Sequence, residues 1–163
     1  MKDNKSYSTL QITTLVILRL LIGWHLLFEG ISKLLNPDWS SFGFLHESKF
    51  VLSGFANWII THHGVLSAVD FLNTWGLIAI GIGLILGIFS RFAAVMGTIL
   101  LLMYFLNNPP LVGLEYTMPA EGSNLIVNKT LIEAIALFLL AVFPAHMVFG
   151  LESLFANYKS KKK

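Results

Sequence analysis

The stretch over residues 10–35 constrains the fold most, because it is long and apolar enough to cross a bilayer. A transmembrane helix needs about 20 consecutive, mostly apolar residues. A charged side chain at the bilayer centre nevertheless costs roughly 2.5 to 3.5 kcal/mol on the insertion scale. We therefore expect the ionisable residues in this stretch to be paired inside a helical bundle. They are Arg19, His25, Glu29 and Lys33.

The composition is typical of an integral membrane protein. Hydrophobic residues make up 55% of the 163 residues and charged residues 12%, whereas charged residues form about 25% of an ordinary soluble domain. The length suits one compact bundle, so we expect a single membrane domain over residues 1–163. The chain contains no cysteine, which excludes disulfides, c-type haem attachment and thiolate metal sites. A net charge of +2 is too small to indicate a nucleic-acid partner.

Four apolar runs predict four membrane-spanning helices. They leave two external loops and a cytoplasmic tail. The expected spans are about 10–35, 71–89, 92–106 and 131–149, the loops are 36–70 and 107–130, and the tail is 150–163.

Small residues recur at four-residue spacing in the second and third spans. Gly83 and Gly87 follow Ala79, and Gly97 follows Ala93. This spacing lets helix backbones approach closely in lipid. Because the connection between these two spans is short, we expect them to form a tight antiparallel pair.

The first external loop contains an apolar segment at 50–60 that is too short to cross the membrane. An interfacial or re-entrant helix is the preferred interpretation, and a fifth span is the alternative. Trp39, Trp58 and Trp75 fit an interfacial aromatic belt. The predicted fold class is all-α: an integral membrane four-helix bundle with an additional short interfacial helix in the first external loop.

Basic residues fall mostly on one side of the predicted bundle. With four spans, the lysines of both chain ends lie on the same side as Arg91. The positive-inside rule then places both termini in the cytoplasm. A fifth span would separate the two basic ends and weaken this agreement.

The polar residues of the first span extend from the membrane centre to its outer surface. A rise of about 1.5 Å per residue places Arg19 some 4 Å from the midplane and Glu29 about 11 Å toward the outer face. His25, Glu29 and Lys33 recur every four residues, so they lie along one side of the helix and can interact in pairs.

The outer ends of the third and fourth spans bring polar side chains to the same layer. This layer is either a functional cavity or a structural polar network, with lysines as interface anchors and Glu133 paired with Lys129 one turn away. We expect no metal site, because no second histidine accompanies His25 at metal-binding spacing. The candidate binding residues are Arg19, His25, Glu29, Lys33, Asn107, Asn128, Lys129 and Glu133.

Several segments resemble the DoxX/DoxD family of small bacterial membrane proteins. They are "RLLIGWHLLFEGISKL", "WGLIAIGIGLILGIFSRFAAVMG", "NNPP" and "EGSNLIVNKTLIEAIAL", and the resemblance covers roughly residues 18–140. It implies a multi-pass protein of the bacterial inner membrane. The residues that it highlights are Arg19, Gly30, Lys33, Arg91, Asn128, Lys129 and Glu133.

The resemblance also implies a function. DoxD-like members are the small subunit of thiosulfate:quinone oxidoreductase, so the chain is expected to be a membrane subunit of a quinone-linked redox complex. Its cofactor would then be a non-covalently bound quinone, with no metal or haem from this chain, and its partner a second redox subunit.

Two other functions stay open. One is a non-catalytic membrane scaffold or assembly partner of another enzyme, in which the polar residues fix helix register. The other, less favoured, is a small-solute transporter, because the sequence lacks evident internal repeats. A homo-oligomer is also left open, and no residue is assigned to catalysis.

Overall fold

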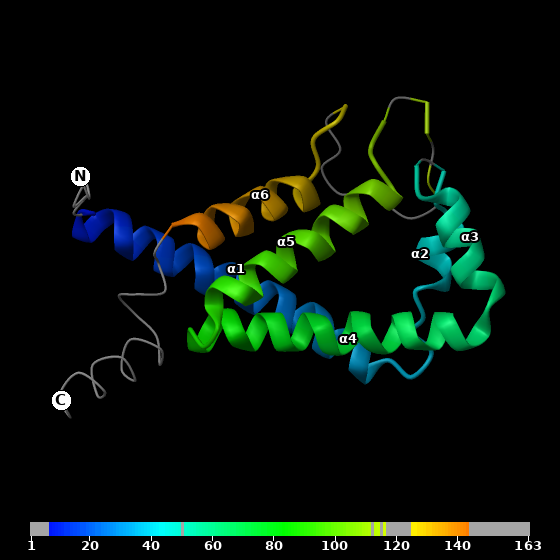
Figure 1. The fold of residues 1–163 in the computed structure, drawn as a ribbon, viewed down its shortest axis with the longest axis horizontal. Coiled ribbons are helices and arrows are strands. Elements are labelled where there is room, and N and C mark those ends of the chain that lie inside the picture. Colours follow the sequence, from blue (N-terminus) through cyan, green and yellow to red (C-terminus); the bar gives the residue numbers. More distant parts are fainter. Residues whose placement is uncertain (1–6, 50, 112, 115, 117–124, 144–163) are drawn as a thin grey trace.

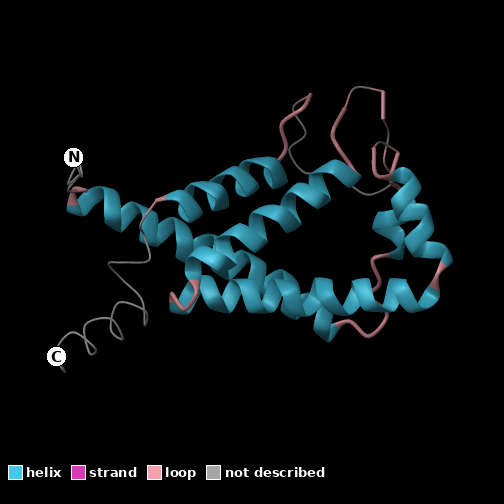
Figure 2. Cartoon of the chain, viewed as in Figure 1, coloured by secondary structure: helices cyan, strands magenta, loops and turns pink. Residues whose placement is uncertain are grey.

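A computed structural model describes residues 7–49, 51–111, 113–114, 116 and 125–143. These residues form helices and no strand, which confirms the predicted all-α class (Figure 2). Three of the helices, α1, α4 and α5, are long and apolar enough to cross a membrane. The helices are α1 (Thr9–Leu35), α2 (Phe42–His46), α3 (Ser53–Thr61), α4 (His63–Leu86), α5 (Ser90–Asn107) and α6 (Lys129–Val142).

Helix α1 has clear signals at both ends. At its start, the Ser8 hydroxyl accepts a hydrogen bond from the Gln11 backbone N–H, and the Ser8 N–H donates to the Gln11 side chain. This capping box satisfies two backbone donors that helix formation leaves unpaired. At its end, Pro37 disfavours helical backbone at Asn36. The 27 residues between these signals span about 40 Å, enough to cross the bilayer core.

The long helices alternate in direction and form two closely packed pairs, α1 with α4 and α5 with α6 (Figure 1). A smaller contact between α4 and α5 joins the pairs. The Tyr7 ring lies edge-on to the Phe143 ring, 6.2 Å between centroids, so the start of α1 and the end of α6 meet at one end of the molecule. Helices α2 and α3 lie at the opposite end. The largest fully buried side chains are Leu26, Leu77, Leu84 and Leu137.

The tightest helix contact joins α1 to α4 and requires glycine. A Cβ atom added to Gly81 would lie 2.6 Å from the backbone nitrogen of Leu27 and 2.7 Å from the backbone oxygen of Gly23. A Cβ atom added to Gly30 would lie 2.9 Å from the backbone nitrogen of Ile78. Backbone atoms cannot rotate aside as side chains can, so α1 and α4 reach this separation only with glycine at these positions.

The small-residue pattern of the second and third spans is confirmed in part. A Cβ atom added to Gly83 would lie 3.1 Å from the Cβ of Ala93, so these two residues meet between α4 and α5 as expected. Gly97 faces α6 as well as α4. Ala79 is exposed. Gly87 follows the end of α4 with a φ of 66°, a left-handed conformation that glycine adopts without strain.

The first external loop, expected over 36–70, contains more helix than the sequence predicted. Helix α3 covers most of the apolar segment at 50–60, and α4 begins at His63, eight residues before the expected start at 71. The early part of α4 is stabilised because its apolar residues cover a small second core. That core contains Leu45, Ala56 and Ile59, packed against Ile60, Val65, Leu66 and Val69.

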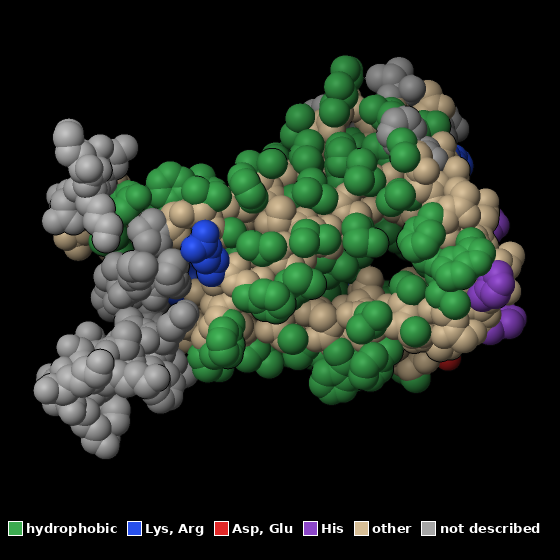
Figure 3. Space-filling view, viewed as in Figure 1, with side chains coloured by type: hydrophobic (Ala, Val, Ile, Leu, Met, Phe, Trp, Pro, Cys, Tyr) green, Lys and Arg blue, Asp and Glu red, His purple; other side chains and the backbone are tan. Residues whose placement is uncertain are grey.

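The predicted fourth span at 131–149 falls partly outside the described residues. Helix α6 ends at Val142, because Phe143 has extended backbone, so the expected uninterrupted span to 149 is wrong at this point. Residues 144–149 and the predicted tail at 150–163 are not described. In the view of Figure 3, hydrophobic side chains are spread over the whole length of the long helices, and almost no charged side chain lies among them. An apolar exterior of this extent indicates contact with the lipid bilayer.

Candidate functional site

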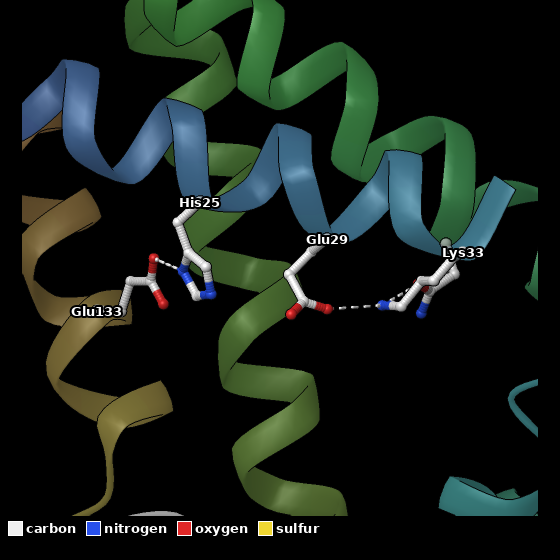
Figure 4. Close-up of polar contacts among 5 residues, drawn as sticks. His25, Glu29, Lys33 and Glu133 are labelled. Atoms are coloured by element: carbon white, nitrogen blue, oxygen red, sulfur yellow. Dashed lines mark hydrogen bonds and ion pairs between the residues drawn. The ribbon is translucent and has the colours of Figure 1, made fainter. Parts of the chain in front are cut away.

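Three ionisable residues of α1 lie in one row along the helix, as their spacing predicted (Figure 4). We call His25, Glu29 and Lys33 the polar row. The Lys33 ammonium lies 3.9 Å from the nearer Glu29 carboxylate oxygen. Lys33 is largely buried, with 15% of its side chain exposed, whereas the Glu29 side chain is 49% exposed. The polar row therefore contains an ion pair between a largely buried lysine and a half-exposed carboxylate.

His25 connects α1 to α6. Its Nδ1 atom lies 2.7 Å from Oε1 of Glu133, which is the distance of a strong hydrogen bond (Figure 4). The carboxylate can only accept, so the ring nitrogen donates. Glu133 therefore contacts a second helix, besides lying one turn after Lys129 on its own helix.

The Lys33 ammonium is held by groups from three other segments of the chain. It donates a hydrogen bond of 3.2 Å to the side-chain oxygen of Asn73 on α4. It also lies 5.1 Å from the centre of the Trp39 ring and 5.5 Å from the centre of the Tyr104 ring. Aromatic faces attract cations within about 6 Å, so the two rings and Asn73 fix the position of this charge.

A pocket of about 270 Å³ opens beside Lys33. On the face drawn in Figure 3, the surface is hollowed between α4 and α5, beside α2 and α3. Helices α1, α2, α4 and α5 and the segment between α1 and α2 all contribute to the pocket wall. The lining residues are Lys33, Trp39, Ser40, Ser41, Phe44, Asn73 and Tyr104.

The Tyr104 hydroxyl is a buried hydrogen-bond donor in this pocket. Within the described part of the chain, it makes no hydrogen bond of acceptable distance and angle, although the Asn73 side chain is close to it. A buried hydroxyl without an acceptor costs free energy, so it calls for a partner such as a water molecule or a bound ligand. The pocket is therefore lined by two residues that can donate hydrogen bonds, Lys33 and Tyr104.

Asn107 is buried and joins the end of α5 to α2. Its amide nitrogen donates to the backbone oxygen of Phe44 at 3.0 Å and to the side-chain oxygen of Asn108 at 2.8 Å. The Ser48 hydroxyl donates to the Asn107 backbone oxygen at 3.3 Å. Asn107 lies behind the pocket wall and does not line the pocket.

The structure places the predicted residues of α6 outside the pocket. The side chain of Asn128 caps the helix by accepting from the backbone N–H of Leu131 at 2.9 Å. Lys129 is exposed at the first position of α6, and Glu133 contacts His25. Among the described residues, no group of three or more histidines and carboxylates is arranged to hold a metal ion.

Arg19 is buried on α1, with 4% of its surface exposed. It lies ten residues before Glu29, a separation of about 15 Å along the helix. The recorded partner of Glu29 is Lys33 instead, and Arg19 does not line the pocket. Of the eight candidate residues from the sequence, only Lys33 lines the pocket.

The segment after α5 is anchored close to the pocket end of the molecule. The Tyr116 hydroxyl donates to the backbone oxygen of Pro109 at 2.9 Å. Burial raises the pKa of Tyr116, and the negative charge of Glu47 raises it further, so the hydroxyl keeps its proton. The Lys49 ammonium lies 5.5 Å from the centre of the Tyr116 ring.

Sequence reasoning missed most of the pocket. Asn73 gave a usable signal, because an amide in an otherwise apolar span usually has a partner. Trp39 had been interpreted as an interfacial anchor, and Tyr104 gave no signal because tyrosines are common at span ends. Asp70, which bonds to Ser40 and Ser41, was placed in a loop rather than on α4.

Comparison with known proteins gives one match. The family model described as DoxX matches residues 14–107, which is more than half of the chain. The matched range contains the polar row and every residue that lines the pocket, and it ends before α6. The chain matches no curated protein and no solved structure.

Proposed function

Because the chain belongs to the DoxX family of membrane proteins, we propose that it is a membrane subunit of a quinone-linked redox complex. The pocket around Lys33 holds the quinone head group in this proposal. The observation that carries it is the largely buried Lys33 ammonium, which lines the pocket beside the Tyr104 ring. The resemblance to the DoxD subunit of thiosulfate:quinone oxidoreductase points to the same chemistry.

The residues present fit a quinone head. Such a head is a planar ring with carbonyl oxygens that accept hydrogen bonds, and the pocket provides two donors beside aromatic side chains. Ligand pockets are usually about 300 to 1,000 Å³ and mostly apolar. The pocket volume of about 270 Å³ therefore suits a ring and leaves an isoprenoid tail to lie along the apolar exterior.

Each residue around the pocket has a role in this proposal. A bound quinone supplies an acceptor of electrons and protons. Lys33 donates to a carbonyl oxygen and favours negative charge there, and Tyr104 supplies the second donor. Asn73 accepts from Lys33 and orients the ammonium, while Glu29 offsets its positive charge. In this proposal the electrons come from a second redox subunit; the chain itself contains no cysteine to bind a thiolate-ligated cluster.

The membrane arrangement is part of the proposal. Helix α6 forms the fourth span of a four-helix bundle in the bacterial inner membrane, and both termini are cytoplasmic. Helix α3 lies at the outer interface, because Phe55 and Trp58 are 53% and 49% exposed and their rings are stacked 6.0 Å apart. Aromatic side chains exposed in this way are typical of membrane interfaces.

A non-catalytic assembly subunit is the second candidate. It is favoured by the contacts that polar residues of different helices make with one another, namely His25 with Glu133 and Lys33 with Asn73. Such contacts fix helix register without any ligand. In that case, changes at Lys33 would affect assembly with a partner but not affinity for a quinone.

Replacing Lys33 by methionine is expected to weaken quinone binding about ten- to a hundredfold, since a hydrogen bond to a charged group contributes roughly 1.5 to 3 kcal/mol. The protein would be reconstituted in lipid nanodiscs and titrated with a short-tailed quinone, with quenching of tryptophan fluorescence as the readout. Tyr104→Phe removes one hydroxyl only and is expected to weaken binding about three- to tenfold.

The double variant Lys33→Met/Glu29→Gln guards against misfolding, because it leaves no unbalanced carboxylate on α1. Lys49→Met is the matched control: Lys49 is exposed, does not line the pocket, and its loss should leave affinity unchanged. Equal quinone affinity in wild type, Lys33→Met and Tyr104→Phe would favour the assembly role instead.

A further inference from the structure

One side of the pocket is built from chain that has little regular structure. We call Trp39, Ser40, Ser41 and Phe44 the pocket roof; they belong to the segment between α1 and α2 and to α2 itself. Trp39 places its ring over the Lys33 ammonium. The segment before α2 has one recorded backbone hydrogen bond within itself, from the Trp39 N–H to Asn36. Two further hydrogen bonds are local, from the Asp38 N–H to the Asn36 side chain and from the Phe42 N–H to the Ser40 hydroxyl. Contacts from other helices are therefore needed to set the position of the roof against α1 and α4.

Asp70 on α4 provides these contacts at one end of the roof. Its Oδ2 accepts from the Ser40 hydroxyl at 2.8 Å, and its Oδ1 accepts from the Ser41 backbone N–H at 2.8 Å. The Ser41 hydroxyl also donates to Oδ1. Both carboxylate oxygens are thus used, and Ser41 is only 4% exposed. Hydrogen bonds to a carboxylate are stronger than those between neutral groups.

The other end of the roof is held separately. The Asn107 amide on α5 donates to the Phe44 backbone oxygen, and the Phe44 ring lies edge-on to Tyr104 with 5.6 Å between centroids. Asn107 and Phe44 therefore fix the α2 end, whereas Asp70 fixes the end that carries Trp39. Losing Asp70 would free Trp39 while α2 stays attached.

We propose that Asp70 is a positioning residue for the pocket. By holding Ser40 and Ser41, it keeps the Trp39 ring over Lys33 and so sets the affinity for a planar carbonyl ligand. This inference rests on the proposed function for its ligand, but the placement of Trp39 can be measured without any ligand.

The test uses Trp39 as the sole fluorophore. Trp24, Trp58 and Trp75 are all about half exposed or more, so replacing them by phenylalanine should preserve the fold. In this background, Asp70→Ala is expected to increase acrylamide quenching of Trp39 and to weaken binding of a short-tailed quinone about tenfold. Asp70→Asn keeps one acceptor oxygen and should give intermediate values.

Asp38→Ala is the matched control, because Asp38 is exposed on the same segment and lies outside the pocket. It should change neither quenching nor affinity. In the Lys33→Met background, Asp70→Ala should add little further loss of quinone affinity, because the Trp39 ring then has no ammonium to cover. Should Asp70→Ala fail to fold, the same comparison is made with Asp70→Asn.

The two proposals fail in different ways. Unchanged quenching of Trp39 in Asp70→Ala would overturn the role of Asp70 whatever the ligand is. Unchanged quinone affinity in Asp70→Ala, with weakened affinity in Lys33→Met, would also overturn it and leave the proposed function standing. A quinone that binds Lys33→Met as well as wild type would overturn the proposed function, and Trp39 quenching would still decide whether Asp70 holds the roof.

Discussion

Gly81→Ala should separate α1 from α4 and lower the free energy of unfolding by about 3 kcal/mol, the upper end of the usual cost of overpacking. The added Cβ would lie 2.6 Å from the Leu27 nitrogen and 2.7 Å from the Gly23 oxygen. Both are backbone atoms within helix α1, so the whole helix must move. Unfolding in mixed micelles of increasing denaturing detergent, followed by circular dichroism, measures the loss.

Gly76→Ala on the same helix is the matched control. An added Cβ there meets no atom within 4 Å, and alanine in a helix is favoured over glycine by roughly 0.5 to 1 kcal/mol. The control should therefore be as stable as the wild type or slightly more stable. Equal stability of the two variants would contradict the glycine contact between α1 and α4.

The glycine contact illustrates how far the sequence predicts this fold. Apolar runs predicted α1 and α5 to within a few residues, because the cost of polar backbone in lipid forces apolar runs into helices. The four-residue spacing pointed to Gly83, yet the closest approach is at Gly81. Spacing identifies a helix face with small residues but not the helix that packs on it, which depends on how all helices fit together.

The polar row was predictable for a similar reason, and the pocket was not. A fixed rise per residue placed Glu133 at about the depth of Glu29 and Lys33, whereas its partner in the structure is His25, one turn before Glu29. His25 and Glu133 meet, although 108 residues separate them. The environment of Lys33 instead depends on a loop that folds back to place Trp39 on the ammonium. The path of this loop depends on tertiary contacts, and no periodic pattern in the sequence predicts it.

A second large effect is expected when the contact between His25 and Glu133 is broken. Within the described ranges, it is the recorded side-chain hydrogen bond between α1 and α6, and it links the two helix pairs. Glu133→Ala leaves the imidazole without its acceptor, so the free energy of unfolding should fall by about 1 to 3 kcal/mol. His25→Ala should cost a similar amount, and the double variant should cost clearly less than the sum of the two.

The resulting coupling free energy should be about 0.6 kcal/mol and at most about 1.7 kcal/mol, the average and the maximum measured for hydrogen bonds between membrane helices. Ile132→Ala is the control, because Ile132 is 62% exposed on the same helix. Spin labels at the exposed positions of Leu21 and Ile135 would report the separation of α1 from α6. A broader distance distribution is expected in Glu133→Ala and not in Ile132→Ala. Strict additivity of the two single variants, with an unchanged distance distribution, would mean that helix packing alone holds α6 against α1.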